Sequence, residues 1–228
     1  MSVENGRADK VNRHILMVAV FFGAFAAQAA DVTGNAGLVS QYVWRGISAS
    51  DGKPALQGGV DAEWDSGWYA GGWGSNVDYA GQTGVELDLY GGWGGHTGDW
   101  NYSAGGTFYT FSDRVAEDFL ELNLSGGWKW LTLDIAIGEY DSSDEYVFAS
   151  LTGEYRNFYA TLGHWDWDSD LPEGSYAELG YGNTLTINGT DLFDYNLAYI
   201  YSEDELLLPG EGNNTLVIGI SKRFGLFN

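Results

Sequence analysis

The stretch from Phe119 to Gly138 alternates between apolar and polar residues, with one interruption at Trp128-Lys129-Trp130. Strict alternation is typical of a β-strand whose two faces meet different environments. A soluble sandwich shows the same alternation, with its apolar face turned toward a shared core. Here a tryptophan lies on each side of the turn and carboxylates lie in the middle of the polar face. This combination favours a transmembrane barrel strand, which faces lipid on the outside and water on the inside.

The same reading marks twelve strand-like segments along residues 30–228, and nothing divides this region into smaller domains. Each segment is about 8 to 12 residues long, close to what a tilted membrane strand needs. We therefore expect an all-β protein, a single antiparallel transmembrane β-barrel of about 12 strands with both termini on the periplasmic side. The segments begin near Asn35, Pro54, Gly67, Thr83, Asp99, Glu117, Leu131, Glu145, Phe158, Ser175, Asp191 and Asn213.

The connections between these segments alternate between two kinds. Short ones lie at residues 65–67, 94–98, 129 and 156–157, whereas mostly longer and acidic ones lie at residues 45–53, 76–82, 112–118, 141–145, 166–174 and 202–212. Short periplasmic turns and long outer loops are the usual asymmetry of outer-membrane barrels. The connection from Asn183 to Thr190 is longer than its class predicts. The leucines at 206–208 are unusual in a loop, and they could fold into the pore mouth or touch lipid.

Aromatic residues flank the short turns. Indole and phenol rings prefer the boundary between hydrocarbon and headgroups, so rings at this level predict an aromatic girdle at a membrane surface. The alternative is a sandwich core with tryptophans at its strand ends. The predicted girdle consists of Trp64, Trp68, Trp93, Trp100, Trp128, Trp130, Tyr155 and Phe158.

The first 29 residues have the pattern of a cleavable signal peptide. A basic start at Arg7, Lys10 and Arg13 precedes an apolar run, and Ala27-Gln28-Ala29 supplies small residues for cleavage. Removing this segment takes away three basic and two acidic residues, so the net charge of −22 becomes −23. Such an acidic chain is unsuited to nucleic acid, which is bound by neutralising phosphates. We expect export through the periplasm to the outer membrane.

The polar face carries most of the candidate chemistry. If the apolar face meets lipid, parity turns nine carboxylates and two amides toward the lumen, and the nearest bases, such as Arg45 and Arg223, lie at strand ends. These acids either hydrate the interior or bias permeation toward cations. The predicted pore-lining residues are Asp61, Glu63, Glu86, Asp88, Glu121, Asn123, Asp134, Glu154, Glu178, Asp194 and Asn196.

Two segments near the start of the predicted barrel resemble a known family. Residues 38–48, Leu-Val-Ser-Gln-Tyr-Val-Trp-Arg-Gly-Ile-Ser, and residues 51–61 are similar to the opening of the TorF family of proposed porins. Residues 67–77 and the closing 220–224 look similar too. The resemblance implies an outer-membrane β-barrel of Gram-negative bacteria, and it implies location more firmly than substrate.

Three classes of function remain open. A passive channel for small solutes or ions, with a cation preference, suits the acidic lumen. A non-conducting surface barrel with a structural or ligand-binding role suits the acidic loops. A membrane-embedded hydrolase needs a nucleophilic serine beside a histidine, and no pattern around His96 or His164 indicates that arrangement. The acids at 166–174 lack the glycine and glutamate of an EF-hand. We therefore predict no enzyme, no catalytic residue, no metal and no cofactor, with outer-membrane lipid, lipopolysaccharide and small solutes or cations as partners.

Overall fold

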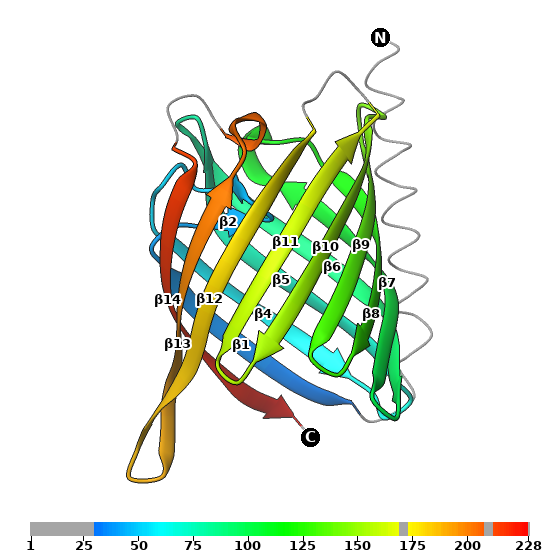
Figure 1. Cartoon of the computed structure of the whole chain (residues 1–228), viewed down its shortest axis with the longest axis vertical. Helices are drawn as coiled ribbons and strands as arrows, with labels where there is room; N and C mark the ends of the chain where they lie inside the picture. Colours follow the sequence, from blue (N-terminus) through cyan, green and yellow to red (C-terminus); the bar gives the residue numbers. More distant parts are fainter. Residues whose placement is uncertain (1–29, 169–172, 208–211, 228) are drawn as a thin grey trace.

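The computed structural model describes residues 30–168, 173–207 and 212–227, and most of these residues form one closed β-barrel (Figure 1). The predicted signal peptide at residues 1–29 lies outside the described residues. Neighbouring strands pair antiparallel, and β1 pairs with β14 to close the cylinder. The strands are β1 (Asp31–Val39), β4 (Ala55–Glu63), β5 (Trp68–Tyr79), β6 (Gln82–Thr97), β7 (Trp100–Phe111), β8 (Phe119–Trp128), β9 (Leu131–Tyr140), β10 (Glu145–Tyr155), β11 (Phe158–Trp167), β12 (Gly174–Ile187), β13 (Thr190–Ser202) and β14 (Asn214–Phe227).

The barrel confirms the predicted fold class. Eleven of the twelve predicted strand starts lie within two residues of the observed ones, and the first strand begins four residues early, at Asp31. Alternation locates strands well because both faces of a barrel strand are specified, one by lipid and one by the lumen. The described residues include no helix long and apolar enough to cross a membrane.

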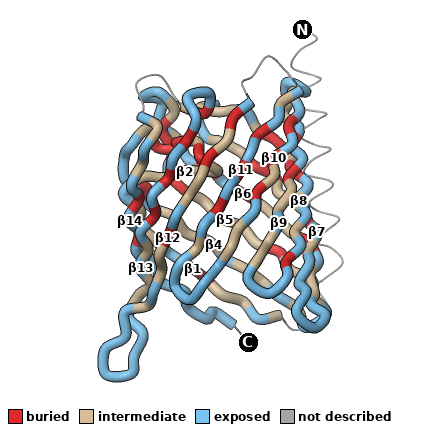
Figure 2. The backbone as a smooth tube through the Cα atoms, in the orientation of Figure 1, coloured by how far each residue is buried: buried red, intermediate tan, exposed pale blue. Residues whose placement is uncertain are grey.

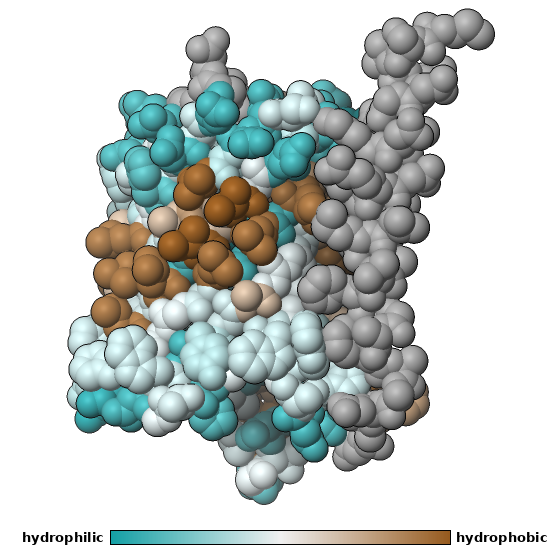
Figure 3. Space-filling view, turned by 90° about the vertical axis from the view of Figure 1, so that its right-hand side faces the viewer, coloured by the Kyte–Doolittle hydropathy of each residue, from teal (hydrophilic) through white to brown (hydrophobic). Residues whose placement is uncertain are grey.

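The outside of the barrel carries a belt of apolar side chains. Figure 3 shows these side chains as a brown band with hydrophilic residues above and below it. Leu56, Leu162 and Leu179 are more than half exposed, although burial of such side chains normally stabilises a protein. A continuous exposed apolar belt marks a surface that meets something other than water. Between the leucines, the alternate residues of each strand point inward.

The two ends of the barrel differ. The short-turn end holds the start of β1, the end of β14 and tight turns whose residues Lys129, Arg156 and Asn188 have positive φ. The opposite end, the long-loop end, holds the longer connections and two 3₁₀ turns, η1 (Ser112–Arg114) and η2 (Asp204–Leu206). The predicted long loop at residues 76–82 is wrong, because β5 and β6 run on to a tight turn at Ala80-Gly81.

The long connection at residues 183–190 also has a structural explanation. Strands β12 and β13 continue pairing down to Ile187 and Thr190, so the connection itself is a two-residue turn at Asn188-Gly189. These extended strands form a hairpin that projects beyond the rest of the short-turn end (Figure 1). The extra length is therefore added strand, and no loop is inserted.

The lumen is filled at the long-loop end. The segment after β1, predicted as an outer loop, turns back into the barrel and forms a small hairpin of β2 (Val43–Trp44) and β3 (Ile47–Ser48). We call residues 42–50 the inner hairpin. Buried residues gather in the upper half of Figure 2, around this hairpin. They form one core of Tyr109, Phe119, Ala136, Tyr146, Phe148, Trp165, Tyr176, Ala198, Ile200, Leu206 and Val217.

Candidate functional site

The tip of the inner hairpin is a two-residue turn made by Arg45 and Gly46. Both residues have positive φ, 51° and 85°, as a two-residue hairpin turn of the I′ type requires. Gly46 is buried against Tyr176, and a Cβ added to it would lie 2.6 Å from the Tyr176 Cβ. Glycine is therefore needed both for the turn and for the close approach. This turn places the Arg45 side chain inside the lumen.

Arg45 forms a two-pronged ion pair with Glu121 on the inner face of β8. Its two terminal nitrogens lie 2.6 and 2.9 Å from the two carboxylate oxygens, and the Glu121 side chain is fully buried. The Tyr146 hydroxyl donates to the same carboxylate at 2.6 Å, and the Tyr109 hydroxyl at 3.3 Å. The Asn123 amide donates to it as well. A charge removed from water needs this many partners to be tolerated.

Aromatic rings and backbone bonds hold the rest of the hairpin tip. The guanidinium carbon of Arg45 lies 4.5 Å from the centre of the Phe148 ring and 4.8 Å from that of Trp44. The Trp165 indole donates to the Arg45 carbonyl at 3.0 Å. Burial alone would lower the pKa of Arg45, but its hydrogen bonds and attraction to Glu121 raise the pKa overall. The arginine is therefore a permanent cation in the lumen.

The base of the inner hairpin is bound to β6, two strands away from β8 in the barrel wall. The Tyr42 hydroxyl donates to Glu86 at 3.2 Å, and the Tyr42 backbone N–H donates to the Ser50 hydroxyl at 2.8 Å. Just beyond the hairpin, the Lys53 ammonium lies 2.6 Å from the Asp78 carboxylate. Arg45 binds Glu121 of β8 and Lys53 binds Asp78 of β5, so the segment is held to the wall at two separate points.

The arginines correct one interpretation of the sequence. We expected no base to oppose the lumen acids except at strand ends, but Arg45 lies within the lumen beside Glu121. Near the short-turn end, Arg223 lies 3.7 Å from Asp61, which also accepts from the Tyr90 hydroxyl. Two of the nine acids therefore have a cationic neighbour. Alternation could not reveal the Arg45 contact, because it does not say where a loop folds.

The other predicted pore-lining residues lie on the inner faces of their strands. Glu86 and Asp88 are buried on β6, and one oxygen of Asp88 has no partner among the described residues. Glu178 accepts from the Tyr159 hydroxyl, and Asp194 accepts from Thr184 at 2.5 Å. Parity and register place Glu63, Glu154 and Asn196 on the same inner faces, while Asn123 and Asp134 border a cavity.

This cavity lies beneath the Arg45–Glu121 pair and has a volume of about 470 Å³. Hydroxyl and amide side chains make up most of its polar wall, and Asp134 is its one wall carboxylate among the described residues. Its polar lining is Arg45, Ser103, Asn123, Ser125, Asp134, Ser150, Thr152, Thr161 and Tyr176.

The predicted girdle residues lie near the short-turn end. Trp100 and Trp128 form a ring pair with centroids 6.3 Å apart on the outside, and Trp130, Tyr155 and Phe158 are each more than half exposed. By parity Trp93 and Trp68 point outward too, and the Trp93 indole donates to the Ser66 carbonyl. Trp64 lies in the turn before β5. Sequence reasoning missed three further outward rings, Tyr102, Tyr181 and Tyr195, which extend the same level.

Other aromatic residues lie inside the barrel. Trp165 is completely buried in the lumen core and stacks with Trp167. Trp73 packs against Tyr42. Leu206 folds into the pore mouth and is buried there, whereas Leu208 lies outside the described residues.

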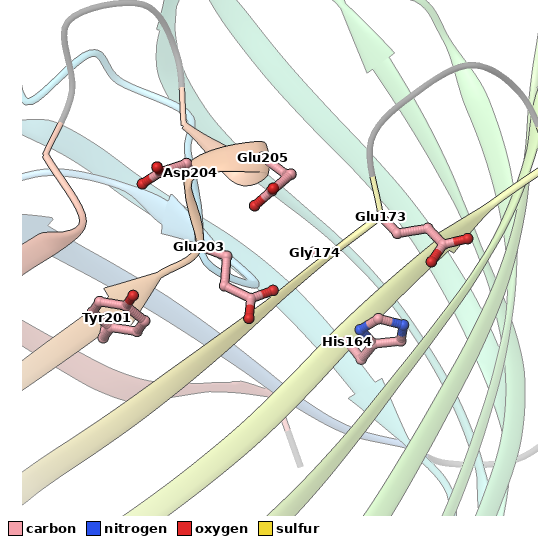
Figure 4. Close-up of a pocket in the computed structure, with 7 residues that line it drawn as sticks. All are labelled: His164, Glu173, Gly174, Tyr201, Glu203, Asp204 and Glu205. Carbon is pink, nitrogen blue, oxygen red and sulfur yellow. The ribbon is translucent and has the colours of Figure 1, made fainter.

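A second hollow of about 390 Å³ lies outside the barrel at the long-loop end (Figure 4). It contains His164, Glu173 and three acids of the loop after β13. The carboxylates of Asp204 and Glu173 point away from one another in Figure 4, and the described residues contain no group of three His, Cys, Asp or Glu that could hold a metal ion. The acidic segment at residues 166–174 falls partly on residues 169–172, outside the described residues.

Comparison with known proteins agrees with the architecture. A family model described as "Bacterial protein of unknown function (Gcw_chp)" matches residues 23–199, and no curated protein matches the chain. The KdgM porin, solved with disordered oligogalacturonate, has a TM-score of 0.51 at 6% identity, with 84% of this chain and 97% of that chain covered. A chain from a study of in-meso crystallization of membrane proteins has the same TM-score at 10% identity, with 85% of this chain and 83% of that chain covered. The TorF resemblance stays a prediction.

Proposed function

We propose that this chain, which belongs to the Gcw_chp family of bacterial proteins of unknown function, is an outer-membrane channel for small solutes or ions. The observation that carries the proposal is a polar lumen enclosed by an apolar outer belt. Lipid on the outside covers the apolar side chains of the belt, and a closed barrel leaves no strand edge unpaired in hydrocarbon. The similar solved barrels, among them the KdgM porin, support the fold.

The orientation of the barrel follows from its two ends. Short turns face the periplasm and long loops face outward in barrels of this type. The aromatic girdle near the short-turn end then lies at the periplasmic membrane surface, with lipid around the belt and lipopolysaccharide beside the loops. The chain reaches this membrane by export through the periplasm, directed by residues 1–29.

The inner hairpin is the gate of the proposed channel. It fills the long-loop half of the lumen through Arg45, Trp44 and Tyr42, so solutes pass only when it moves or leaves room at its side. Its contacts are largely side-chain contacts, and the described residues include few backbone bonds between it and the wall, such as Asp78 N–H to the Ala49 carbonyl. A hairpin held in this way can leave the wall without unpairing the barrel.

The proposed channel prefers cations. Nine lumen acids face two lumen arginines, so the interior stays strongly negative after both pairs are counted. A narrow passage with fixed charge of one sign concentrates ions of the other sign. Salt screens this field over about 8 Å at physiological ionic strength, so the preference is largest in dilute salt.

Planar-bilayer recording tests the channel and its selectivity together. In a dilute KCl gradient, we expect discrete conductance steps and a reversal potential on the cation side. The triple variant Asp134→Asn, Glu178→Gln and Asp194→Asn removes three lumen charges and should shift that potential toward zero. The matched control Glu139→Gln, Glu145→Gln and Asp166→Asn removes three charges from outward positions and should leave it unchanged. A wild-type potential on the anion side would reject the cation preference.

A non-conducting barrel is the second candidate, and the filled outer half of the lumen favours it. In that case the protein acts by binding ligands at its loops or in its lumen. The two candidates differ in the behaviour of Arg45→Met, which frees the hairpin tip. A channel should show more frequent or larger steps in this variant, whereas a non-conducting barrel should show none in either protein.

A further inference from the structure

The cavity beneath the Arg45–Glu121 pair is lined by one continuous row of polar side chains. Ser103 pairs with Ser125 across β7 and β8, Ser125 pairs with Asp134 across β8 and β9, and Asp134 pairs with Ser150 across β9 and β10. We call these four residues the polar row. Neighbouring strands are about 4.8 Å apart, so the row extends roughly 14 Å across the wall, perpendicular to the strands.

Three members of the polar row are serines, each with a hydroxyl group. Ser150 is 93% buried, whereas Ser103 and Ser125 are partly exposed, and all three line the cavity. A hydroxyl on a cavity wall can both donate and accept a hydrogen bond. Two residues further along β10, toward the short-turn end, the Thr152 hydroxyl lies 2.9 Å from that of Thr161. The wall therefore offers several donors and acceptors to a bound molecule.

The charges around the cavity select against anions. Arg45 is the one cation in the lining, and both of its terminal nitrogens are already bonded to Glu121. Asp134 has no cationic partner among the described residues and leaves a negative charge in the wall. An anionic ligand would meet this charge without a free arginine to balance it.

We infer that this cavity is a binding site for a neutral polyhydroxylated solute of disaccharide size. Its volume of about 470 Å³ lies within the range of small-molecule pockets. The row of hydroxyls matches a ligand that carries a hydroxyl on nearly every carbon, and the rings of Phe148 and Tyr176 supply apolar contact. This binding site would add a solute class to the proposed channel. The inference rests on the proposed function only for the route by which the solute reaches the cavity.

Isothermal titration of the folded protein in a sugar-free detergent tests the site, with maltose as the neutral probe and digalacturonate as the anionic one. We expect maltose to bind and digalacturonate to bind at least about tenfold more weakly. Each hydrogen bond lost costs roughly twofold to tenfold in affinity. The variant Ser125→Ala/Ser150→Ala should therefore weaken maltose binding at least about fivefold.

Two controls make the result interpretable. Ser75→Ala/Ser221→Ala removes two hydroxyls from inner faces outside the cavity and should leave maltose binding unchanged. Asp134→Asn should reduce the discrimination against digalacturonate. A heat-shift gel of each variant verifies that the barrel has folded.

The outcomes separate the two proposals. Equal maltose binding by wild type and Ser125→Ala/Ser150→Ala, or no maltose binding by folded wild-type protein, overturns the site even if the protein conducts ions. Maltose binding that Ser125→Ala/Ser150→Ala weakens, in a protein that never conducts, supports the site and rejects the channel.

Discussion

At the scale of single residues, the position of the inner hairpin depends on the contact between Arg45 and Glu121. The arginine reaches an otherwise uncompensated carboxylate that is fully buried, and 76 residues separate the two in the chain. Removing one partner of a buried pair leaves the other charge without compensation, which costs about 3–5 kcal/mol. The free energy of unfolding in micelles should therefore fall by that amount in Arg45→Met, as measured by urea titration with tryptophan fluorescence.

The control for this experiment is Lys129→Met. Lys129 lies 3.6 Å from Asp99 at an exposed turn, and such pairs contribute at most about 1 kcal/mol. Adding Glu121→Gln to Arg45→Met should recover part of the loss, because the buried charge is then gone. Equal stability of Arg45→Met and Lys129→Met would show that the pair is not a structural contact.

Gly46 supports a second prediction at this scale. Alanine at this position must adopt φ near 85° and also clashes with Tyr176, whereas alanine at Gly52, with φ of 67°, meets open space on all but one side. Left-handed backbone costs a non-glycine residue roughly 1–2 kcal/mol. Gly52→Ala should lose about that much stability, and Gly46→Ala should lose more. Near-UV circular dichroism of the lumen aromatics should weaken only in Gly46→Ala.

At the scale of elements, the inner hairpin is the proposed gate. Lys53 fastens its base to Asp78, and the hydrogen bond to that carboxylate raises the pKa of Lys53 above 10.5. A raised lysine pKa contributes stability that is complete below the unfolded value and is lost as pH rises through the folded value. Conductance should therefore increase only above about pH 10.5. In Lys53→Met this step should be absent, and a step that persists there would assign it to another group.

At the scale of the whole molecule, closure between β1 and β14 makes the barrel a membrane structure. Eight residue pairs join these strands, and each unpaired backbone group in hydrocarbon costs several kcal/mol. A chain that ends after Asn213 lacks β14 and should not form a heat-modifiable barrel on gels. A chain that ends after Phe224 keeps most of the pairing and should form one. Assembly of the shorter chain would contradict closure at this seam.

The sequence by itself determined the number of strands, where most of them begin and the face on which most side chains lie. Alternation is a local signal with a period of two, and each face of a barrel strand has its own solvent. The outward direction of Leu122 and the inward direction of Glu121 can therefore be predicted from their neighbours in sequence alone. The rings around the short turns follow for the same reason, since their level is set by distance along one strand.

Only the tertiary structure decided what fills the lumen. The signal for the inner hairpin was present, because Arg45-Gly46 between Val43-Trp44 and Ile47-Ser48 suits a tight turn. The place where this hairpin packs was not encoded locally. Arg45 binds Glu121, 76 residues away, and its carbonyl accepts from Trp165, 120 residues away. The Gly46 carbonyl accepts from Ser202, 156 residues away. Contacts over such separations depend on how the whole barrel closes, and no local pattern encodes them.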